Sequence, residues 1–265
     1  MKYAIITGAY GGMGYATANL LLDLGYTVFA LDKNIGDKRE NLIPIETDIT
    51  AVESVKSAFL AVKQYTSTID VIIHFAGVYM LDSLVEMTND DWNKIFKVNL
   101  YGVFYVNKTF LPLLKNGSKI IITTSELAPL DPLPFTGVYA ITKSALDKYA
   151  YSLRMELQLK DVNVSVLRAG AVSTGMLGVS TRALDKFCEK TELYQFSADK
   201  FRKIVLRVEA KSVKPEKIAL KVYKILKKQK PKFAYKINRN KLLLLLNAMP
   251  KRMQFYAIKK ILNKK

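Results

Sequence analysis

The fold is decided by residues 2–14, Lys-Tyr-Ala-Ile-Ile-Thr-Gly-Ala-Tyr-Gly-Gly-Met-Gly. Residues 2–7 form an apolar run typical of a buried strand, and the leucine-rich segment 15–25 has the apolar spacing of a helix. Glycines between a strand and a helix let the backbone approach a pyrophosphate, whose charge then lies at the helix N-terminus. A glycine-rich turn without a ligand is the alternative. The flanking strand and helix favour a dinucleotide-binding loop.

The next predicted strand, residues 27–31, is followed directly by Asp32. A carboxylate at this place can accept hydrogen bonds from the adenosine ribose, and it repels a 2′-phosphate. Asp32 therefore favours NAD over NADP. The neighbouring Lys33 could pair with that phosphate, so NADP stays open as the cofactor, and an ordinary turn residue is the alternative for Asp32.

Strands and helices continue to alternate up to about residue 170. This alternation predicts right-handed crossovers and a parallel sheet with helices on both faces. Further strands are expected at 43–47, 71–75, 119–124 and 163–168, and helices after a Thr50 cap and at 92–114 and 138–160. Ligands of such sheets bind at the carboxyl ends of the strands. We therefore expect the residues that follow the strands to converge: Gly8, Asp32, Asp48, Gly77, Ser125 and Gly170.

Tyr139 and Lys143 are four residues apart in the helix expected at 138–160, so they share one face. A nearby ammonium favours the phenolate and lowers the phenol pKa from its usual value of about 10. A shift of three units corresponds to roughly 4 kcal/mol. Such a tyrosine could exchange a proton near pH 7. Taken alone, the pair could also be a solvated helix face.

The composition of the 265 residues limits the chemistry. One cysteine, Cys188, and one histidine, His74, give no basis for an intrachain disulfide or a metal site. We expect no signal peptide and no spanning segment, because no apolar window reaches about 18–20 residues. A cytoplasmic location is the resulting expectation. His74 is interpreted as a core residue of its strand, with a polar role near a cofactor as the alternative.

The positive charge is concentrated in residues 200–265, which hold 22 Lys and Arg against 2 Asp and Glu. Apolar residues recur at helical spacing in 216–230 and again among the lysines of 241–265. Basic amphipathic helices are typical of membrane surfaces, so we predict peripheral contact with an anionic membrane, on its cytoplasmic face. A lysine-rich face docked on the body is the alternative. Nucleic acid is not expected as a partner, because aromatic residues are few in this region and no nucleic-acid module is recognisable.

Several motifs in a fixed order resemble the classical subgroup of the short-chain dehydrogenase/reductase family, over about residues 2–175. Residues 7–14 match its T-G-x-x-x-G-x-G loop, and Lys-Val-Asn-Leu at 97–100 matches its asparagine motif. Further matches are Asp48, Ser125, Tyr139, Lys143, Gly170 and Thr174. Two motifs depart from the family pattern: its N-N-A-G reads His-Phe-Ala-Gly at 74–77, and its proline before Gly170 is Ala169.

The resemblance implies an α/β protein with a three-layer Rossmann fold, a parallel sheet with helices on both faces, and a substrate lid at about 175–210. The charge and apolar pattern adds a basic helical C-terminal extension. We therefore expect one oxidoreductase domain at 1–240, which includes the lid, and a basic amphipathic tail at 241–265. Helices around 100–114 and 139–160 would pair subunits in a homodimer or homotetramer. The implied cofactor is NAD, with NADP as the alternative.

The resemblance also assigns residues. Tyr139 would be the general acid or base, Lys143 would lower its pKa and bind the nicotinamide ribose, Ser125 would bind the substrate oxygen, and Asn99 would support the proton path. The residues implied to contact the cofactor are Gly8, Tyr10, Gly11, Gly12, Met13, Gly14, Asp32, Asp48, Ile49, Ala76, Gly77, Tyr139, Lys143, Gly170, Val172 and Thr174.

The implied activity is NAD(P)-dependent interconversion of an alcohol and a ketone or aldehyde. The expected lid is rich in large apolar residues, which favours a lipophilic substrate such as a steroid, retinoid or lipid: Met176, Leu177, Leu184, Phe187, Leu193, Tyr194, Phe196 and Phe201. Plain packing of these residues onto the domain is the alternative. Other hypotheses are a 3-oxoacyl-type or sugar/polyol reductase of the same family, and a non-catalytic dinucleotide-binding regulatory or membrane-surface protein.

Overall fold

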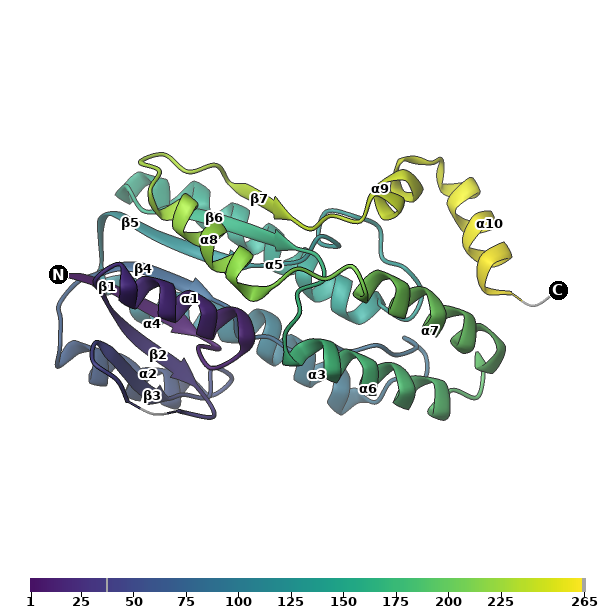
Figure 1. The fold of residues 1–265 in the computed structure, drawn as a ribbon, viewed down its shortest axis with the longest axis horizontal. Helices are drawn as coiled ribbons and strands as arrows, with labels where there is room; N and C mark the ends of the chain where they lie inside the picture. The colour runs from purple at the N-terminus through teal and green to yellow at the C-terminus, as the bar shows by residue number, and fades with distance from the viewer. Residues whose placement is uncertain (37, 264–265) are drawn as a thin grey trace.

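The computed structural model describes residues 1–36 and 38–263, without the side chains of 176–180 and 209. Within these residues a seven-stranded parallel sheet forms the middle layer, in the order β3-β2-β1-β4-β5-β6-β7 (Figure 1). The strands are β1 (Lys2–Thr7), β2 (Tyr26–Asp32), β3 (Leu42–Glu46), β4 (Ile69–His74), β5 (Leu114–Thr123), β6 (Asn163–Ala169) and β7 (Ala234–Ile237). The expected Rossmann fold is confirmed. Its strand order reverses between β1 and β4, where such sheets bind their ligands.

Helices cover both faces of the sheet, because successive side chains of each buried strand point to opposite sides. On one face, Ala4 and Ile6 of β1 pack with α1 (Gly12–Asp23) and α8 (Pro215–Leu226). On the other face, Ile5 of β1 packs with α2 (Val52–Lys63) and α4 (Gly102–Phe110). On this same face, α5 (Gly137–Leu157) covers β5 and β6. The strands are therefore apolar on both sides.

Helix α8 corrects one interpretation of the basic C-terminal region. Its apolar stripe, Ile218, Val222 and Ile225, is fully buried against the sheet and α1. This stripe is part of the core, so the membrane-surface interpretation is wrong for residues 216–226. The strand that follows, β7, was not expected from the sequence, and it extends the sheet beyond β6.

The start of α2 also differs from the prediction. The N-cap residue is Ala51, and no side chain caps this helix. The Thr50 hydroxyl instead donates to Oδ1 of Asp48 at 2.7 Å. The helix begins one residue later than a Thr50 cap requires, so Thr50 lies before the cap position.

The helical segment predicted at 92–114 consists of four pieces: α3 (Asn89–Phe96), a π-helical turn (Lys97–Tyr101), α4, and a short 3-10 turn (Leu111–Leu113) that contains Pro112. Helix α3 begins where the Thr88 side chain accepts a hydrogen bond from the Asp91 amide. The π-helical turn carries Asn99, whose side chain is fully buried.

Two helical pairs lie beyond the carboxyl edge of the sheet, on the right of Figure 1. The first is α6 (Gly175–Lys190) with α7 (Gln195–Glu209), at the place expected for a lid. Their shared core includes Leu184, Phe187 and Phe201. The second pair is α9 (Lys241–Ala248) with α10 (Lys251–Leu262). Among the described residues, none of the helices combines the length and hydropathy that a membrane span requires.

Candidate active site

A cavity of about 560 Å³ opens at the carboxyl ends of β1, β2 and β3. Twelve residues predicted to contact a cofactor line it: Gly8, Tyr10, Gly11, Gly12, Met13, Gly14, Asp32, Asp48, Ile49, Ala76, Gly77 and Thr174. The other four, Tyr139, Lys143, Gly170 and Val172, line a second cavity of about 210 Å³. Met13, Gly77 and Thr174 line both cavities. The two cavities therefore meet, and the first has the place and shape of a dinucleotide groove.

The glycine loop fits a pyrophosphate because no side chain can occupy its inner positions. A Cβ on Gly14 would lie 2.1 Å from the carbonyl oxygen of Gly8, and one on Gly12 would lie 2.7 Å from Cγ2 of Thr174. Helix α1 begins at Gly12, so its first amides have no acceptor within the helix. These amides, close to bare backbone, form a cradle for an anion.

At the end of the groove formed by residues that follow β2 and β3, the charged side chains already have hydrogen-bond or ion-pair partners. Oδ2 of Asp32 accepts a hydrogen bond from the Tyr10 amide at 3.0 Å. Nζ of Lys33 lies 2.8 Å from Oδ2 of Asp48. Partial burial acts to raise the pKa of the Asp48 carboxyl, but the hydrogen bonds from Lys33 and Thr50 outweigh it and lower the pKa. Oδ1 of Asp32 accepts from the Asn34 amide at 3.4 Å, and Lys33 is held by Asp48.

Ser125, Tyr139 and Lys143 converge in the second cavity. Ser125 follows β5, and its hydroxyl is hydrogen-bonded to the Tyr139 phenol. Nζ of Lys143 donates to the carbonyl oxygen of Thr123 at 3.2 Å. The ring of Tyr79 stands edge-on to the Tyr139 ring, with 4.6 Å between centroids and 67° between planes. The phenol is thus fixed by Ser125 on one side and an aromatic edge on another.

Asn99 lines neither of the two cavities, but its side chain holds Val78, which lines both. Its Oδ1 accepts from the Val78 amide at 2.8 Å, and its Nδ2 donates to the Val78 carbonyl oxygen at 3.0 Å. Nδ2 also donates to Oγ1 of Thr142 on α5, at 3.2 Å. A Cβ on Gly77 would lie 3.2 Å from Asn99 Oδ1 and 3.6 Å from Lys143 Nζ. Asn99 therefore connects the loop that follows β4 to helix α5.

The pKa values of the central pair differ from the prediction. Burial raises the pKa of Tyr139 to about 12, and the hydrogen bond from Ser125 opposes this rise. Burial lowers the pKa of Lys143 to about 8. The expected depression of the Tyr139 pKa is wrong for the protein without bound ligands. The physical reason is that both groups leave water, and the ammonium donates to the Thr123 carbonyl rather than to the phenol.

His74 has the role of a core residue, as its strand context indicated. Its ring is buried, with Nε2 2.8 Å from Oδ1 of Asn107 on α4, and it lines neither cavity. Burial lowers its pKa to about 4, so the ring is neutral. The next residue, Phe75, lines both cavities.

Sequence reasoning missed several residues of the second cavity, among them Tyr79, Glu126 and Leu243. Glu126 is only 7% exposed, and its Oε2 accepts from the Asn240 amide at 2.6 Å. The sequence signal for Glu126 was the presence of a charged residue directly after Ser125, at the end of a buried strand. Leu243 comes from α9, and nothing in the leucine run 242–246 distinguishes it from its neighbours.

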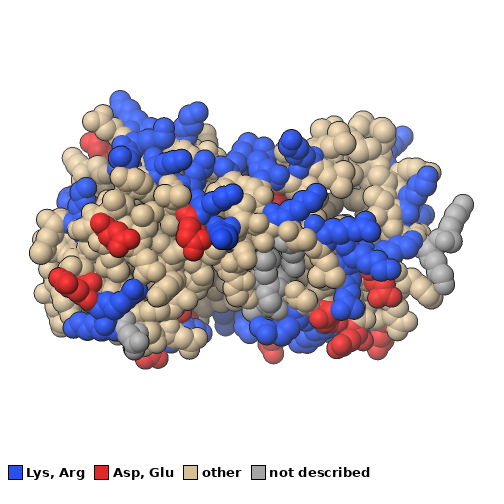
Figure 2. Space-filling view, viewed as in Figure 1, with Lys and Arg blue, Asp and Glu red and all other residues tan. Residues whose placement is uncertain are grey.

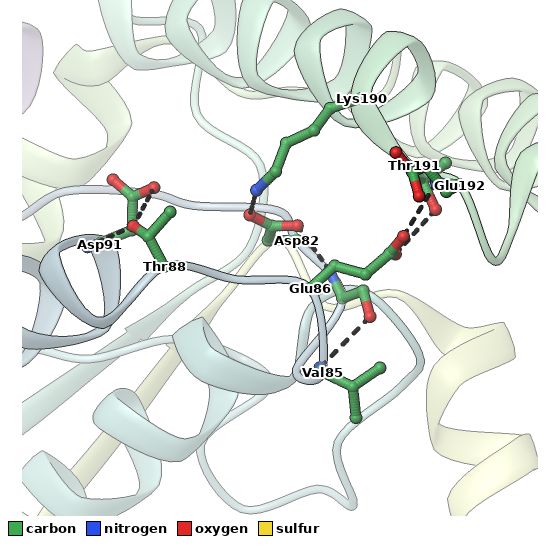
Figure 3. A network of polar contacts seen from close by, with 9 residues as sticks. Asp82, Val85, Glu86, Thr88, Asp91, Lys190, Thr191 and Glu192 are labelled. Carbon is green, nitrogen blue, oxygen red and sulfur yellow. Dashed lines mark hydrogen bonds and ion pairs between the residues drawn. The ribbon is translucent and has the colours of Figure 1, made fainter.

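Helix α7 contributes Phe201, Ile204, Val205 and Val208 to the second cavity. Leu193 and Phe196 are 68% and 66% exposed, while Met176 and Leu177 have side chains outside the described part of the chain. Figure 3 shows how the α6–α7 connection is held. The carboxylate of Glu86 accepts from the Glu192 amide and the Thr191 hydroxyl, both at 2.8 Å, and Lys190 pairs with Asp82 at 3.0 Å.

Comparison with known proteins identifies the family. A family model described as short chain dehydrogenase matches residues 2–185. Estradiol 17-beta-dehydrogenase 2 of Mus musculus is 33% identical over 212 residues, which cover 75% of this chain and 55% of that protein. The chain thus spans about half the length of this relative. 3-Ketodihydrosphingosine reductase of Bacteroides thetaiotaomicron is 25% identical over 234 residues, which cover 88% of this chain and 86% of that protein.

A solved structure shares the fold. It is 3-ketoacyl-(acyl-carrier-protein) reductase from Brucella melitensis complexed with NADH, with a TM-score of 0.73, 20% identity, and coverage of 89% of this chain and 96% of that chain. The family model covers more than half of the sequence, and the glycine loop and the cluster after β5 lie within the stretch that it matches. This protein belongs to the short-chain dehydrogenase/reductase family of oxidoreductases.

Proposed function

We propose that the protein interconverts an alcohol and a ketone or aldehyde with a nicotinamide dinucleotide, and that its substrate is lipophilic. The convergence of Ser125, Tyr139 and Lys143 in a cavity that adjoins the glycine-loop groove carries this proposal. When bound, the cofactor supplies or accepts the hydride. The protein has to position the substrate oxygen and to move one proton.

For carbonyl reduction, the proposed acid is Tyr139. Its phenol, with a pKa of about 12, is protonated at neutral pH and can donate to the substrate oxygen as negative charge develops there. The Ser125 hydroxyl stabilises the same oxygen by a hydrogen bond. The ammonium of Lys143 favours the phenolate that remains. Asn99 is a positioning residue, because it holds Val78 and Thr142 on either side of the pair.

A lipophilic substrate is favoured by an apolar wall of the second cavity. This wall is made of apolar side chains from the loop after β5, from α7 and from α9: Leu127, Leu133, Phe201, Ile204, Val205, Val208 and Leu243. Burial of apolar surface contributes about 25 cal/mol per Å², so such a wall selects apolar groups.

We propose NAD as the cofactor, because the carboxylate of Asp32 lies in the groove and its neighbour Lys33 is paired with Asp48. We also propose a homodimer or homotetramer formed through α4 and α5. Both helices expose large side chains, with Phe104 41%, Tyr151 54% and Met155 51% accessible. The removal of such apolar side chains from water favours association.

We further propose one oxidoreductase domain at 1–240 and a tail at 241–265 that contacts an anionic membrane on its cytoplasmic face. The outward face of α10 carries Met253, Phe255 and Tyr256, which are 53–68% exposed, among Arg252, Lys259 and Lys260. Figure 2 shows a surface without charged side chains over α9 at the upper right, with Lys and Arg side chains beside it. Aromatic and basic side chains together suit a lipid headgroup region.

The activity is tested by following NADH and NADPH consumption with a panel of steroid ketones, retinal, an acetoacetyl thioester and sugars. Turnover confined to the apolar carbonyls is expected. Turnover of sugars alone would overturn the lipophilic assignment, and turnover of none with intact cofactor binding would support a regulatory role.

The membrane contact is tested by pelleting with vesicles of phosphatidylserine and phosphatidylcholine. Binding at low salt is expected, with loss in a variant carrying Phe255→Ser and Tyr256→Ser. Leu60→Ser, on the exposed side of α2, is the control, because Leu60 is 61% exposed far from the tail. Equal binding of all three proteins would contradict the proposal.

A further inference from the structure

Helix α9 leaves the sheet directly beside the catalytic cluster. Only residues 238–240 separate it from β7. Nδ2 of Asn238 donates to the carbonyl oxygens of Ala171 at 2.8 Å and Lys211 at 2.9 Å. A Cβ on Gly170 would lie 1.9 Å from the Asn238 carbonyl oxygen. The turn before α9 is therefore packed onto residues 170 and 171, which line the second cavity.

Glu126 fixes the first turn of α9. The carboxylate accepts from the Asn240 amide at 2.6 Å, and the Asn240 side chain in turn caps α9 by accepting from the Leu242 amide at 2.9 Å. The Glu126 amide donates to the Ala169 carbonyl oxygen at 2.9 Å. Since Glu126 follows Ser125 directly, one peptide unit connects the catalytic serine to the residue that holds the helix.

The far end of α9 and helix α10 are held by the same loop and by the lid. Oδ1 of Asn247 accepts from the Asp131 amide at 2.8 Å, and Lys251 forms an ion pair with Asp131. Leu262 packs on the lid core, and Lys200 of α7 donates to the Asn263 carbonyl oxygen. The tail thus bridges the loop after β5 and helix α7, which are the two other sources of apolar cavity wall.

As a result, α9 presents two faces. Leu243 lines the cavity, as do Phe201 and Val205 of α7. Leu242 and Leu245 are 70% and 65% exposed on the outer side. A helix that served only as a surface attachment would have no side chain in the cavity and no buried carboxylate at its cap.

We propose that α9 is a wall of the substrate site, in which Leu243 determines specificity by contacting the apolar part of the substrate remote from the reacting carbon, and Glu126 is the positioning residue that holds α9 there. This inference rests on the proposed function for the class of substrate. The proposal makes the tail part of the substrate site. It identifies an elongated apolar group as the part of the substrate that contacts α9.

The first test measures binding of straight-chain 2-alkanones, from 2-butanone to 2-decanone, to the NADH-loaded protein by titration calorimetry. Affinity is expected to rise about fourfold per added methylene in the wild-type protein, given about 0.8 kcal/mol per buried CH₂. Leu243→Trp puts a larger side chain along this wall and should abolish the gain for the longer ketones. Leu245→Trp, on the outer side of the same helix, should retain the whole gain.

Equal behaviour of the two tryptophan variants, or no dependence on chain length in the wild-type protein, would overturn the proposal. NADH consumption is recorded on the same samples. Chain-length-dependent binding without any consumption would refute the proposed enzymatic function and leave the role of the wall intact, so the two failures are distinguishable.

The second test examines Glu126 by hydrogen exchange of the amides in 240–246. Glu126→Ala should accelerate their exchange about tenfold or more, whereas Glu126→Gln, which retains an acceptor oxygen, should restore slow exchange. Glu156→Ala, at an exposed position of α5, is the control. Unchanged exchange in Glu126→Ala, with the protein folded by circular dichroism, would show that Glu126 does not hold α9.

Discussion

The ammonium of Lys143 lies over the ring of Tyr139, with its nitrogen 5.7 Å from the ring centroid. It is hydrogen-bonded to the Thr123 carbonyl, so it acts on the phenol through space. An interaction of this kind can favour the phenolate once a substrate oxygen takes the proton, without holding the phenol ionised beforehand. The arrangement suits an acid that stays protonated until the reaction.

Tyr139→Phe should lower kcat by about 10²- to 10⁴-fold, the usual contribution of a general acid or base. NADH affinity, measured by fluorescence titration, should change little, because the ring and its packing on Tyr79 remain. Tyr149→Phe is the matched control. It removes a buried hydroxyl from the same helix, where its partner is Asn107, outside the cavity. A Tyr139→Phe variant with unimpaired turnover would exclude the proposed acid.

Asp32→Asn should change the choice of cofactor. The amide retains an acceptor for the Tyr10 amide but loses the charge that repels a 2′-phosphate. NADPH affinity should rise about tenfold, which is about 1.4 kcal/mol, with a smaller change for NADH. The measurement is a pair of fluorescence titrations, with Asp23→Asn at the exposed end of α1 as control. Wild-type protein that binds NADPH more tightly than NADH would contradict the assignment of NAD.

Gly14→Ala should destabilise the fold and abolish cofactor binding. Its Cβ would lie 2.1 Å from the Gly8 carbonyl oxygen, and this backbone atom can yield only by moving the loop. Overpacking of this kind costs about 1–3 kcal/mol, visible in thermal unfolding. Gly175→Ala has nothing within 4 Å of the added Cβ and should leave the melting temperature within about a degree. Equal stability of both variants would refute the close packing of the loop.

His74 should make stability depend on pH below 6.5. Its folded pKa of about 4 lies below the ordinary value of 6.5, so the unfolded chain binds an additional proton between these values. The free energy of unfolding should therefore fall as the pH decreases from 6.5 to 4, by up to about 3 kcal/mol. His74→Gln should remove this part of the slope in urea denaturation. An identical slope in both proteins would show that the His74 ring is not buried neutral.

The sequence predicted the parts of the fold that depend on local pattern. The alternation of apolar strands with amphipathic helices sufficed for β1 to β6, because each of these strands carries an apolar run. It did not suffice for β7, a strand of four residues whose side chains are only partly buried or exposed at the sheet edge. For α8, the basic composition was misleading, since lysines cover the outer side of a helix whose apolar stripe is in the core.

The candidate site could be predicted as a set of residues but not as an arrangement. Spacing placed Tyr139 beside Lys143, yet the sequence holds no measure of how far each is removed from water, and burial decides their pKa values. Glu126 and Leu243 were missed because their place in the site depends on contacts between positions more than a hundred residues apart in the sequence. Such contacts leave no periodic trace in the chain.

The two ends of the ribbon lie on opposite sides of the molecule, with the first residue beside the amino edge of the sheet and α10 beyond the lid (Figure 1). Met1 is 97% exposed, whereas Asn263 is bonded to Lys200 of α7. A purification tag or biosensor linker is therefore best attached at the N-terminus. A fusion at the C-terminal end would lie next to α7, and immobilisation there would disturb this helix and thereby change the measured substrate affinity.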